Sequence, residues 1–417
     1  MTQTQNTSQK NNKSALPEGW KEVKLGEVAE KMISWWTPST KKDEYYWWNI
    51  PWIRTQEVNF NYIKDTEIKI TELWLKNSSA KWIPENTVII AMYWNSAWRV
   101  AYSKIKATTN QACCNFIADK NKVDSKFIFF NLLNRYSEIK WMANWAAQQN
   151  LNVWNLKNLS LLLPPLPEQK SIASILSSFD NKIELLQEEN ETLEEIGKTI
   201  FKEWFGKYKV GDELPEGWKV GKLGEIAKLK SWYAFKSKDF VEDNNKKALK
   251  IKDLKWNWKI DLSDVSSISN DIVEQERVKY FKLEAWDVVL AMSWNTTWKI
   301  WIVPKSEFKI YLNQRVWKFF VKDKKYNSFI YFFLMSWNYE DKILNMGYGS
   351  AQPNISPSQI ENIDLIIPNN KKIEEFLNIS DNLFKKIIEN NYQIQTLKNL
   401  RDTLLSKLMS GEVRVKD

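Results

Sequence analysis

The sequence predicts an α+β protein in which two mostly β domains alternate with two long helices that pair with each other. Three observations lead to this prediction. The same motifs occur twice, about 200 residues apart. Two stretches without internal proline carry apolar residues at helical spacing, and the remainder of each copy is rich in short β-branched runs separated by turn residues.

A tandem duplication sets the domain organisation. Leu16–Trp20 and Leu214–Trp218 both read LPEGW at an offset of 198, and Val88–Met92 matches Val288–Met292 at an offset of 200. At the first of these offsets, Ile53-Arg54 also matches Ile251-Lys252. We therefore expect a disordered lead at 1–15, a first domain at 16–167, a first long helix at 168–210, a second domain at 211–368 and a second long helix at 369–410.

Each copy repeats one order of elements. β-branched runs such as Thr87–Ala91 and Val316–Val321 predict strands. Aromatic, helix-like segments follow at 125–136 and 328–337, and short strands at 159–163 and 363–367 come next. Prolines at 164, 165 and 167, and at 368, then mark the start of each long helix, because proline suits the entry of a helix and not its interior.

The two long helices have complementary charge. From Glu168 to Glu203 there are nine acidic and four basic residues, whereas Lys371 to Lys407 holds seven basic and five acidic residues. Opposite charge favours pairing of the two helices, although each could instead simply cover its own domain. Asn190 lies in the apolar stripe of the first helix, as Asn390 and Asn391 do in the second, where such residues often fix the register of a helix pair.

The composition excludes several classes of enzyme. There is no histidine, and the two cysteines, Cys113 and Cys114, are neighbours in an apolar run, where side chains on a strand point to opposite faces. A disulfide, a zinc site and histidine-dependent catalysis are therefore not expected, and the cysteines read as buried small side chains. The formal charge is +9, and because the first helix carries −5 the remainder carries +14, which suits a polyanion such as DNA.

No apolar run is long enough for a membrane span, and the first fourteen residues are polar. We therefore expect a cytoplasmic protein.

Glycine and tryptophan have unusual frequencies, at 11 and 24 residues. Many tryptophans occupy positions where turn chemistry asks for glycine, which alone takes a positive φ without strain. We hypothesise that the source reads UGA as glycine; the rival interpretation is that exposed tryptophans stack on nucleic-acid bases. Trp20, Trp52, Trp204 and Trp218 lie in apolar or strand-like settings and read as true tryptophans. The turn-like positions are Trp35, Trp36, Trp47, Trp48, Trp94, Trp145, Trp258, Trp294 and Trp337.

Several motifs together resemble the specificity subunit of type I restriction–modification systems. They are the LPEGW openings, SWWTPST at 34–40, IPWIRTQEV at 50–58, LPPLPEQKSIASIL at 163–176, LNQRVWKF at 312–319 and SAQPNIS at 350–356. Each motif alone is weak, but their order and repetition over residues 16–410 are specific. The tryptophans at turn positions are the departures from the family pattern.

The resemblance implies two target-recognition domains, each reading one half of a split double-stranded DNA site, joined by helices packed as an antiparallel coiled coil. It also implies two methyltransferase (modification) subunits and restriction subunits as partners. S-adenosylmethionine, ATP and Mg²⁺ would then belong to those partners, and the chain itself would be neither an enzyme nor a cofactor carrier. In agreement, the sequence has no phosphate-binding loop, methyltransferase signature or GxGxxG motif.

Polar side chains in turns that follow predicted strands are the candidate DNA contacts. Arginine and glutamine can pair with base edges, whereas serine, threonine and lysine more often hold phosphate. Any one of them could instead be a solvated surface residue, and the amides shared by both copies could be loop caps. The candidates are Thr37, Ser39, Thr40, Lys41, Arg54, Thr55, Gln56, Asn95, Ser96, Arg99, Gln148, Gln149 and Asn150 in the first copy, and Lys236, Ser237, Lys252, Asp253, Asn295, Thr296, Lys299, Gln352 and Asn354 in the second.

Two alternatives remain open at this point. The chain could be a stand-alone DNA-binding or anti-restriction protein built from the same domains without methyltransferase partners. An enzyme would need a catalytic cluster, which the sequence does not offer.

Overall fold

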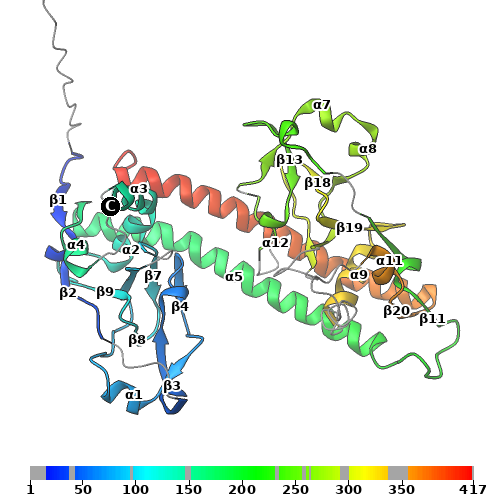
Figure 1. Ribbon diagram of the computed structural model, residues 1–417, viewed down its shortest axis with the longest axis horizontal. Helices are drawn as coiled ribbons and strands as arrows, with labels where there is room; N and C mark the ends of the chain where they lie inside the picture. Colours follow the sequence, from blue (N-terminus) through cyan, green and yellow to red (C-terminus); the bar gives the residue numbers. More distant parts are fainter. Residues whose placement is uncertain are drawn as a thin grey trace, which may run out of the picture. The chain divides into compact units, whose positions relative to one another are not determined.

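The structure is a computed structural model that describes residues 16–36, 43–93, 97–145, 152–230, 234–255, 260–262, 264–291, 300–336 and 356–415. The chain divides into two compact units (Figure 1). The first unit comprises Met1–Asn181 and Asn399–Asp417, and the second comprises Lys182–Lys398.

The described residues of the first unit form ten short strands and the start of a long helix. In chain order its elements are β1 (Lys21–Lys24), η1 (Leu25–Glu27), β2 (Ala29–Ile33), η2 (Asp43–Tyr45), β3 (Tyr46–Ile53), η3 (Thr55–Glu57), β4 (Asn61–Ile63), β5 (Lys69–Ile70), α1 (Glu72–Lys76), β6 (Val88–Ala91), β7 (Val100–Ser103), β8 (Thr108–Thr109), β9 (Cys113–Ala118), α2 (Ser125–Asn134), α3 (Tyr136–Trp145), α4 (Val153–Lys157), β10 (Ser160–Leu163) and α5 (Leu166–Phe205).

The second unit repeats this plan and ends in the other long helix. Its elements are β11 (Lys219–Lys222), α6 (Leu223–Ile226), β12 (Ala227–Lys230), η5 (Ser237–Asp239), β13 (Lys246–Leu249), η6 (Ile251–Asp253), β14 (Ser266–Ser267), α7 (Asn270–Val273), α8 (Glu276–Lys279), β15 (Lys282–Leu283), β16 (Val288–Ala291), β17 (Ile300–Ile302), β18 (Lys309–Leu312), β19 (Val316–Val321), α9 (Tyr326–Ser336), α11 (Pro357–Glu361), β20 (Asp364–Ile367) and α12 (Asn370–Ser410).

Among the described residues, the sheets share one strand order in the two copies, apart from β4, which occurs only in the first, and β15, which occurs only in the second. In the first unit a five-stranded sheet runs β2-β9-β6-β7-β4 and a three-stranded sheet runs β5-β3-β8. In the second unit the corresponding sheets run β12-β19-β16-β17 and β14-β13-β18-β15. In each copy the first strand pairs antiparallel with the last strand, which precedes the long helix. These pairs are β1 with β10 and β11 with β20. The duplication seen in the sequence is therefore also a duplication of topology.

The core of each domain lies between its central strands and its aromatic helix. Strands β6 and β16 are buried along their whole length, as expected for apolar runs covered on both faces. Helix α2 begins at an Asp124 N-cap, whose side chain accepts from the Phe127 amide, and it buries three phenylalanines in this core. The predicted strands and aromatic helices of both copies are confirmed, with ends shifted by one or two residues.

The two cysteines are free and buried on β9, as the sequence predicts. Burial raises the pKa of the Cys114 thiol to about 12, so it stays protonated at neutral pH.

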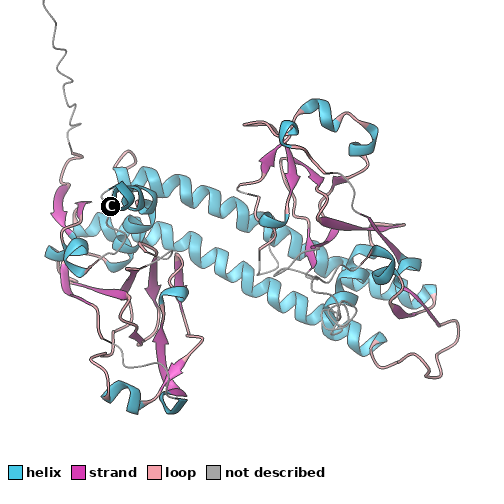
Figure 2. Cartoon of the chain, viewed as in Figure 1, coloured by secondary structure: helices cyan, strands magenta, loops and turns pink. Residues whose placement is uncertain are grey.

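The two long helices pack against each other in both units, and Figure 2 shows each as one continuous helix. In the second unit, Ile183 and Leu186 of α5 pack with Ile394 of α12. In the first unit, Leu176 of α5 shares a buried cluster with Leu405 and Leu408 of α12. The predicted pairing is therefore confirmed. The alternative reading also holds, because the same helices cover their own domains through residues such as Ile172 and Phe376.

The direction of the helix pair follows from its polar contacts. In the first unit the Arg401 Nη1 donates to Asp180 Oδ1 at 2.7 Å, and the Tyr62 hydroxyl of β4 donates to Asp180 Oδ2 at 2.8 Å. In the second unit Asn190 Nδ2 donates to Asn391 Oδ1 at 3.0 Å. As the α5 number rises from 180 to 190 the α12 number falls from 401 to 391, so the helices are antiparallel.

The predicted seam position of the asparagines is also found. Asn390 Nδ2 donates to Asn190 Oδ1 and to Glu189 Oε2, both at 3.0 Å, and Asn390 is fully buried. A polar cluster therefore interrupts the apolar seam at this point of the helix pair.

The first unit is closed by the last part of the chain. Arg414 donates through Nε and Nη2 to the Glu168 carboxylate at 2.6 and 2.8 Å, and Met409 lies in the same buried cluster as Trp20. The bidentate pair fixes the turn after α12 to the start of α5. This unit is therefore built from two segments that are far apart in the sequence.

Candidate nucleic-acid interface

Eight of the predicted contact residues lie in the described part of the chain: Arg54, Thr55, Gln56, Arg99, Lys236, Ser237, Lys252 and Asp253. The others lie outside the described residues: Thr37, Ser39, Thr40, Lys41, Asn95, Ser96, Gln148, Gln149, Asn150, Asn295, Thr296, Lys299, Gln352 and Asn354.

In the first domain, the turn after β3 holds three of these side chains. Arg54 is the N-cap of the one-turn helix η3, and its backbone amide donates to Glu57 Oε2 at 2.9 Å. The Arg54 guanidinium donates through Nη2 to Glu67 Oε2 at 2.6 Å. The Gln56 amide contacts this pair, either as a donor to Glu67 or, with its two ends exchanged, as an acceptor from Arg54. Thr55 is the half-buried first residue of η3. The turn therefore presents a cation, an amide and a carboxylate together.

Arg99 lies in the turn before β7, and its Nη1 donates to Asn59 Oδ1 at 3.2 Å. Asn59 follows η3, so Arg99 is connected to the same side of the domain as Arg54.

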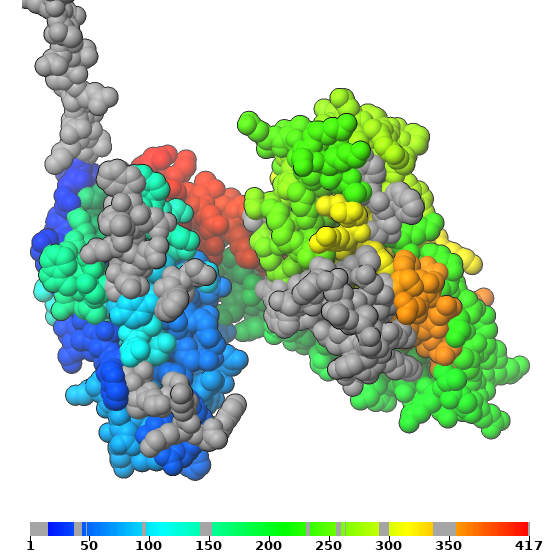
Figure 3. All heavy atoms as spheres, viewed as in Figure 1, coloured from blue at the N-terminus to red at the C-terminus, as the bar shows by residue number. Residues whose placement is uncertain are grey.

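The second domain repeats the turn after its corresponding strand. Lys250 is the N-cap of η6, and its amide donates to Asp253 Oδ2 at 2.8 Å. Lys252 Nζ donates to the carboxylate and the backbone carbonyl of Asp264, each at 3.0 Å. Lys252 is exposed, and Figure 3 shows green chain of the second unit at the surface in this view. The Asp264 carboxylate raises the pKa of Lys252, which is therefore charged at any physiological pH.

This geometry corrects the alignment of the two copies. The sequence pairs Arg54 with Lys252, whereas the caps of the two turns pair Arg54 with Lys250 and Gln56 with Lys252. The capping carboxylate is the better guide, because it must lie three residues after the N-cap. Asp253 is thus equivalent to Glu57. It is 3% exposed, and burial raises its pKa above the ordinary value, so its side chain supports the turn from within.

Lys236 and Ser237 belong to a similar turn, in which the Lys236 amide donates to Asp239 Oδ2 at 2.7 Å. Both residues are exposed. A basic residue followed three positions later by an acid therefore marks each of these turns, and this signal in the sequence could have identified Lys250 and Asp253 as its caps.

Three charged residues next to the predicted contacts were missed. Lys250 Nζ donates to Ser266 Oγ at 2.9 Å and lies 3.7 Å from the centre of the Phe240 ring. Burial and the neighbouring Lys252 lower the pKa of Lys250. Glu67 and Asp264 come from segments that return to the turn 13 and 12 residues after their partners. No local pattern in the sequence predicts that return.

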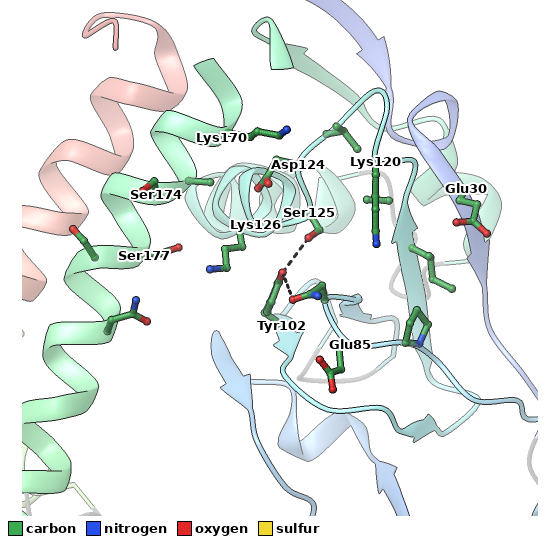
Figure 4. Close-up of a pocket in the computed structure, with 18 residues that line it drawn as sticks. Glu30, Glu85, Tyr102, Lys120, Asp124, Ser125, Lys126, Lys170, Ser174 and Ser177 are labelled. Carbon is green, nitrogen blue, oxygen red and sulfur yellow. Dashed lines mark hydrogen bonds between the residues drawn. The ribbon is translucent and has the colours of Figure 1, made fainter. Parts of the chain in front are cut away.

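A cleft of the first unit lies between its domain and α5, with a volume of about 840 Å³ (Figure 4). In Figure 4, Lys170, Ser174 and Ser177 of α5 face Ser125 and Lys126 of α2 across it. On the domain side the Tyr102 hydroxyl bonds to Asn86 at 2.9 Å and to Ser125 at 3.0 Å. The lining combines three lysines with three carboxylates (Lys120, Lys126, Lys170, Glu30, Glu85 and Asp124), so it selects neither an anion nor a cation.

Neither a cluster of metal-ligating side chains nor a membrane-spanning helix occurs in the part of the chain that the structure describes. The described residues contain no group of three side chains that could hold a metal ion. Within the same residues, no helix is long and apolar enough to cross a bilayer.

Two tryptophans have backbone conformations that favour glycine. Trp98 has φ +70° and Trp286 has φ +86°. Such values strain a bulky side chain. They occur outside the turn-like positions named above, and Phe60 takes a similar value at φ +57°, so the glycine hypothesis stays a prediction. Trp47 and Trp48, in contrast, lie within strand β3 and not in the predicted turn. Trp94, Trp258, Trp294 and Trp337 lie outside the described residues.

The comparisons with known proteins agree with each other. A family model described as the type I restriction modification DNA specificity domain matches residues 17–195 and 215–398. The MjaIX specificity subunit of a type I restriction enzyme from Methanocaldococcus jannaschii is 29% identical, over 96% of this chain and 95% of the relative. The MjaVIII specificity subunit from the same organism is 28% identical, over 89% and 88%. The crystal structure of a type I restriction–modification S subunit from M. genitalium covers 93% of this chain and 96% of its own, with a TM-score of 0.55 and 18% identity.

Proposed function

Because the chain belongs to the family of type I restriction–modification DNA specificity subunits, we propose that it reads a two-part duplex site, one part with each domain. The family assignment makes the chain the non-catalytic DNA specificity subunit of such a system, and subunits of this family carry no cofactor themselves. Binding to a bipartite site, the partners and the contact residues are the proposed steps.

One observation supports the proposal most directly. The same turn, with a basic residue at its cap and an ion pair beside it, follows the equivalent strand in both domains. Two equivalent turns in a duplicated chain suit a site with two recognised parts. The side chains of the two turns differ, with arginine and glutamine in one and two lysines in the other, so the two parts of the site should differ in sequence.

The helix pair supports the same reading. Helices α5 and α12 have 40 and 41 residues. A helix of 40 residues is about 60 Å long, which exceeds the spacing of about 34 Å between half-sites one turn of duplex apart. The domain boundaries at 16–167 and 211–368, with spacer helices at 168–210 and 369–410, stay part of this proposal.

The proposed contacts in the described residues are Arg54, Thr55, Gln56, Arg99, Lys236, Ser237 and Lys252. Arg54, Gln56 and Arg99 suit base edges, because each can form two hydrogen bonds in one plane. The remaining residues suit phosphate. We assign Asp253 to support of the turn because it is buried. The other predicted contacts, from Thr37 to Asn354, stay predictions.

The proposed partners are double-stranded DNA, two methyltransferase subunits and restriction subunits. Methyl transfer from S-adenosylmethionine and cleavage with ATP and Mg²⁺ would take place on those partners. Co-purification of the chain with a methyltransferase is the measurement that checks this part of the proposal.

The DNA-reading step is tested by Arg54→Ala. The target is first obtained by selecting bound duplexes from a random library with the wild-type complex. Loss of the guanidinium should weaken binding to the selected duplex by about 1–3 kcal/mol, and binding to scrambled duplex much less. Lys69→Ala, which removes a cation from the adjacent strand β5, is the matched control and should weaken both alike. Equal loss on both duplexes for Arg54→Ala would count against base reading there.

A further inference from the structure

In both domains, an acidic residue from a later segment of the chain contacts the basic turn. In the first, Glu67 accepts from Arg54 at 2.6 Å; in the second, Asp264 accepts from Lys252 at 3.0 Å. The two acids belong to equivalent segments, each leading into a strand that pairs antiparallel with β3 or β13. An ion pair is therefore built beside the turn in both domains, although the cation is the N-cap itself in the first and lies two residues after the N-cap in the second.

The returning segments are fixed to the turns by their backbones. The Glu67 amide donates to Glu57 Oε1 at 2.9 Å, and Glu57 also caps Arg54. In the second domain the Asp261 amide donates to the Asp253 carbonyl at 2.8 Å, and Asp253 caps Lys250. Each acid thus lies on a segment that is hydrogen-bonded to the capping residue of the turn.

Stability does not explain these acids. The Glu67 and Asp264 side chains are 71% and 96% exposed. Ion pairs with such exposure contribute little to the free energy of unfolding, because water screens them. A carboxylate on a surface that binds DNA also repels phosphate. Two such acids in the same place of both domains therefore need another reason.

We propose that Glu67 and Asp264 are positioning residues for sequence specificity, an inference that rests on the proposed DNA binding. Each carboxylate holds the cation through one nitrogen and leaves at least one donor hydrogen of that cation uncommitted. For Arg54, Nη2 is held by Glu67 while Nη1 keeps hydrogens for a base edge. The negative charge also repels the phosphates of the DNA backbone. Duplex that lacks the recognised sequence is bound mainly through these phosphates, so the acid weakens non-specific binding most.

The test uses Glu67→Gln and Asp264→Asn, which remove the charge and keep the size. Asp65→Asn and Asp243→Asn are matched controls, because these acids pair with Lys69 and Lys247 nearby in the same domains. Affinity of the complex is measured for the selected duplex and for scrambled duplex. All four variants should bind scrambled duplex more tightly, since each removes one negative charge. The ratio of the two affinities should fall about tenfold for Glu67→Gln and Asp264→Asn only.

A second readout separates positioning from a general structural effect. Repeating the selection with each variant should show relaxed preference at one or two base positions, in one half of the site for Glu67→Gln and in the other half for Asp264→Asn. If both ratios match those of the controls, or if either variant relaxes both halves equally, the inference is wrong while the proposed function stands. If the wild-type complex itself does not distinguish selected from scrambled duplex, the proposed function fails and the inference fails with it.

Discussion

The two units use one backbone plan and fill it with different side chains. In the first unit the domain leaves a cleft against α5, where Ala173, Ser174 and Ser177 are small. At the equivalent place of the second unit, Lys325 reaches Glu374 of α12 at 2.8 Å and Trp286 packs against Phe384. Contacts between a domain and its helix are therefore variable in this fold.

A second difference lies inside the two central sheets. Thr87 and Asn115, both fully buried and neutral, occupy in the first copy the places that Asp287 and Lys318 occupy in the second. Lys318 Nζ donates to Asp287 Oδ2 at 2.6 Å, with little exposure of either side chain. The two copies therefore keep the capped turns at the surface, whereas the buried polar residues of their central sheets differ. The fold tolerates either a neutral pair or an ion pair at these buried positions.

The largest expected effect comes from Asp180→Ala. Asp180 accepts from Arg401 and from Tyr62, and both Asp180 and Arg401 are mostly buried. Burial and the Asp180 carboxylate hold the pKa of Tyr62 well above its ordinary range, so the tyrosine remains a donor. Removing the acid leaves the mostly buried Arg401 with only the exposed Asp402 as its partner, and the Tyr62 hydroxyl loses this acceptor. The free energy of unfolding should therefore fall by about 3–5 kcal/mol in urea titrations.

Asp381→Ala is the matched control in the other copy. Asp381 occupies the equivalent position but pairs with the exposed Lys385 one turn along its own helix. Its loss should cost about 0–1 kcal/mol. Similar losses for both variants would show that Asp180 and Asp381 stabilise their units equally. That result would contradict the difference described between the two copies.

The buried pair of the second sheet is probed by Asp287→Thr, alone and with Lys318→Met. The single variant should cost about 3 kcal/mol, because Lys318 is left buried without its acid. The new hydroxyl at position 287 would be close to the Glu284 carbonyl, to which the Asp287 amide already donates, much as the Thr87 hydroxyl donates to the Pro84 carbonyl. The double variant should recover most of the loss in the same urea titration. No recovery would mean that the second copy depends on the charges themselves.

The same pair gives a dependence on pH. Burial raises the pKa of Asp287 above its ordinary value of 3.8. The folded state therefore binds this proton more readily than the unfolded state, and the contribution of Asp287 to stability is present below pH 3.8 and is lost as pH rises through the folded pKa. Relative to the double variant, the wild-type chain should lose free energy of unfolding across that window. An opposite slope would contradict the assigned cause.

The smallest expected effect concerns the asparagines in the seam of the helix pair. Asn190 and Asn390 are buried, and Asn390 Oδ1 has no hydrogen-bond partner among the described residues. Replacing both by leucine should raise the free energy of unfolding by about 1 kcal/mol, because polar groups leave a buried seam together. Thr192→Leu on the exposed face of α5 is a control that should change it little. A large loss for the double variant would show that the asparagines are needed to hold the pair together.

The sequence predicted those parts of the fold that repeat or carry strong periodicity. The duplication, the buried strands, the aromatic helices and the two paired helices all follow from patterns that extend over many residues. The asparagine seam was predicted because Asn190 and Asn391 interrupt otherwise apolar stripes. The α5 boundaries differ slightly, since the helix begins at Leu166 with Pro167 in its first turn and ends at Phe205 before Gly206.

The candidate interface was harder to predict, because it depends on contacts between distant residues. The ion pairs of Arg54 and Lys252 form only once the chain has returned through a further 12 or 13 residues. Likewise, Asp253 looks like a surface acid in the sequence, and only the folded turn shows that it is buried. The tryptophans illustrate the same limit: Trp286 has a φ that suits glycine, yet it packs on Phe384. UGG codons at Trp94 and Trp294 would exclude the glycine hypothesis.

Closure of the first unit by Arg414, Leu405 and Leu408 has a consequence for synthesis. The second unit is contiguous, so it can fold when Lys398 has left the ribosome. The first unit, although its domain is made earlier, lacks its closing segment until residues 399–417 have been made. The nascent chain therefore completes its domains in reverse order, and its first domain depends longest on protection from aggregation.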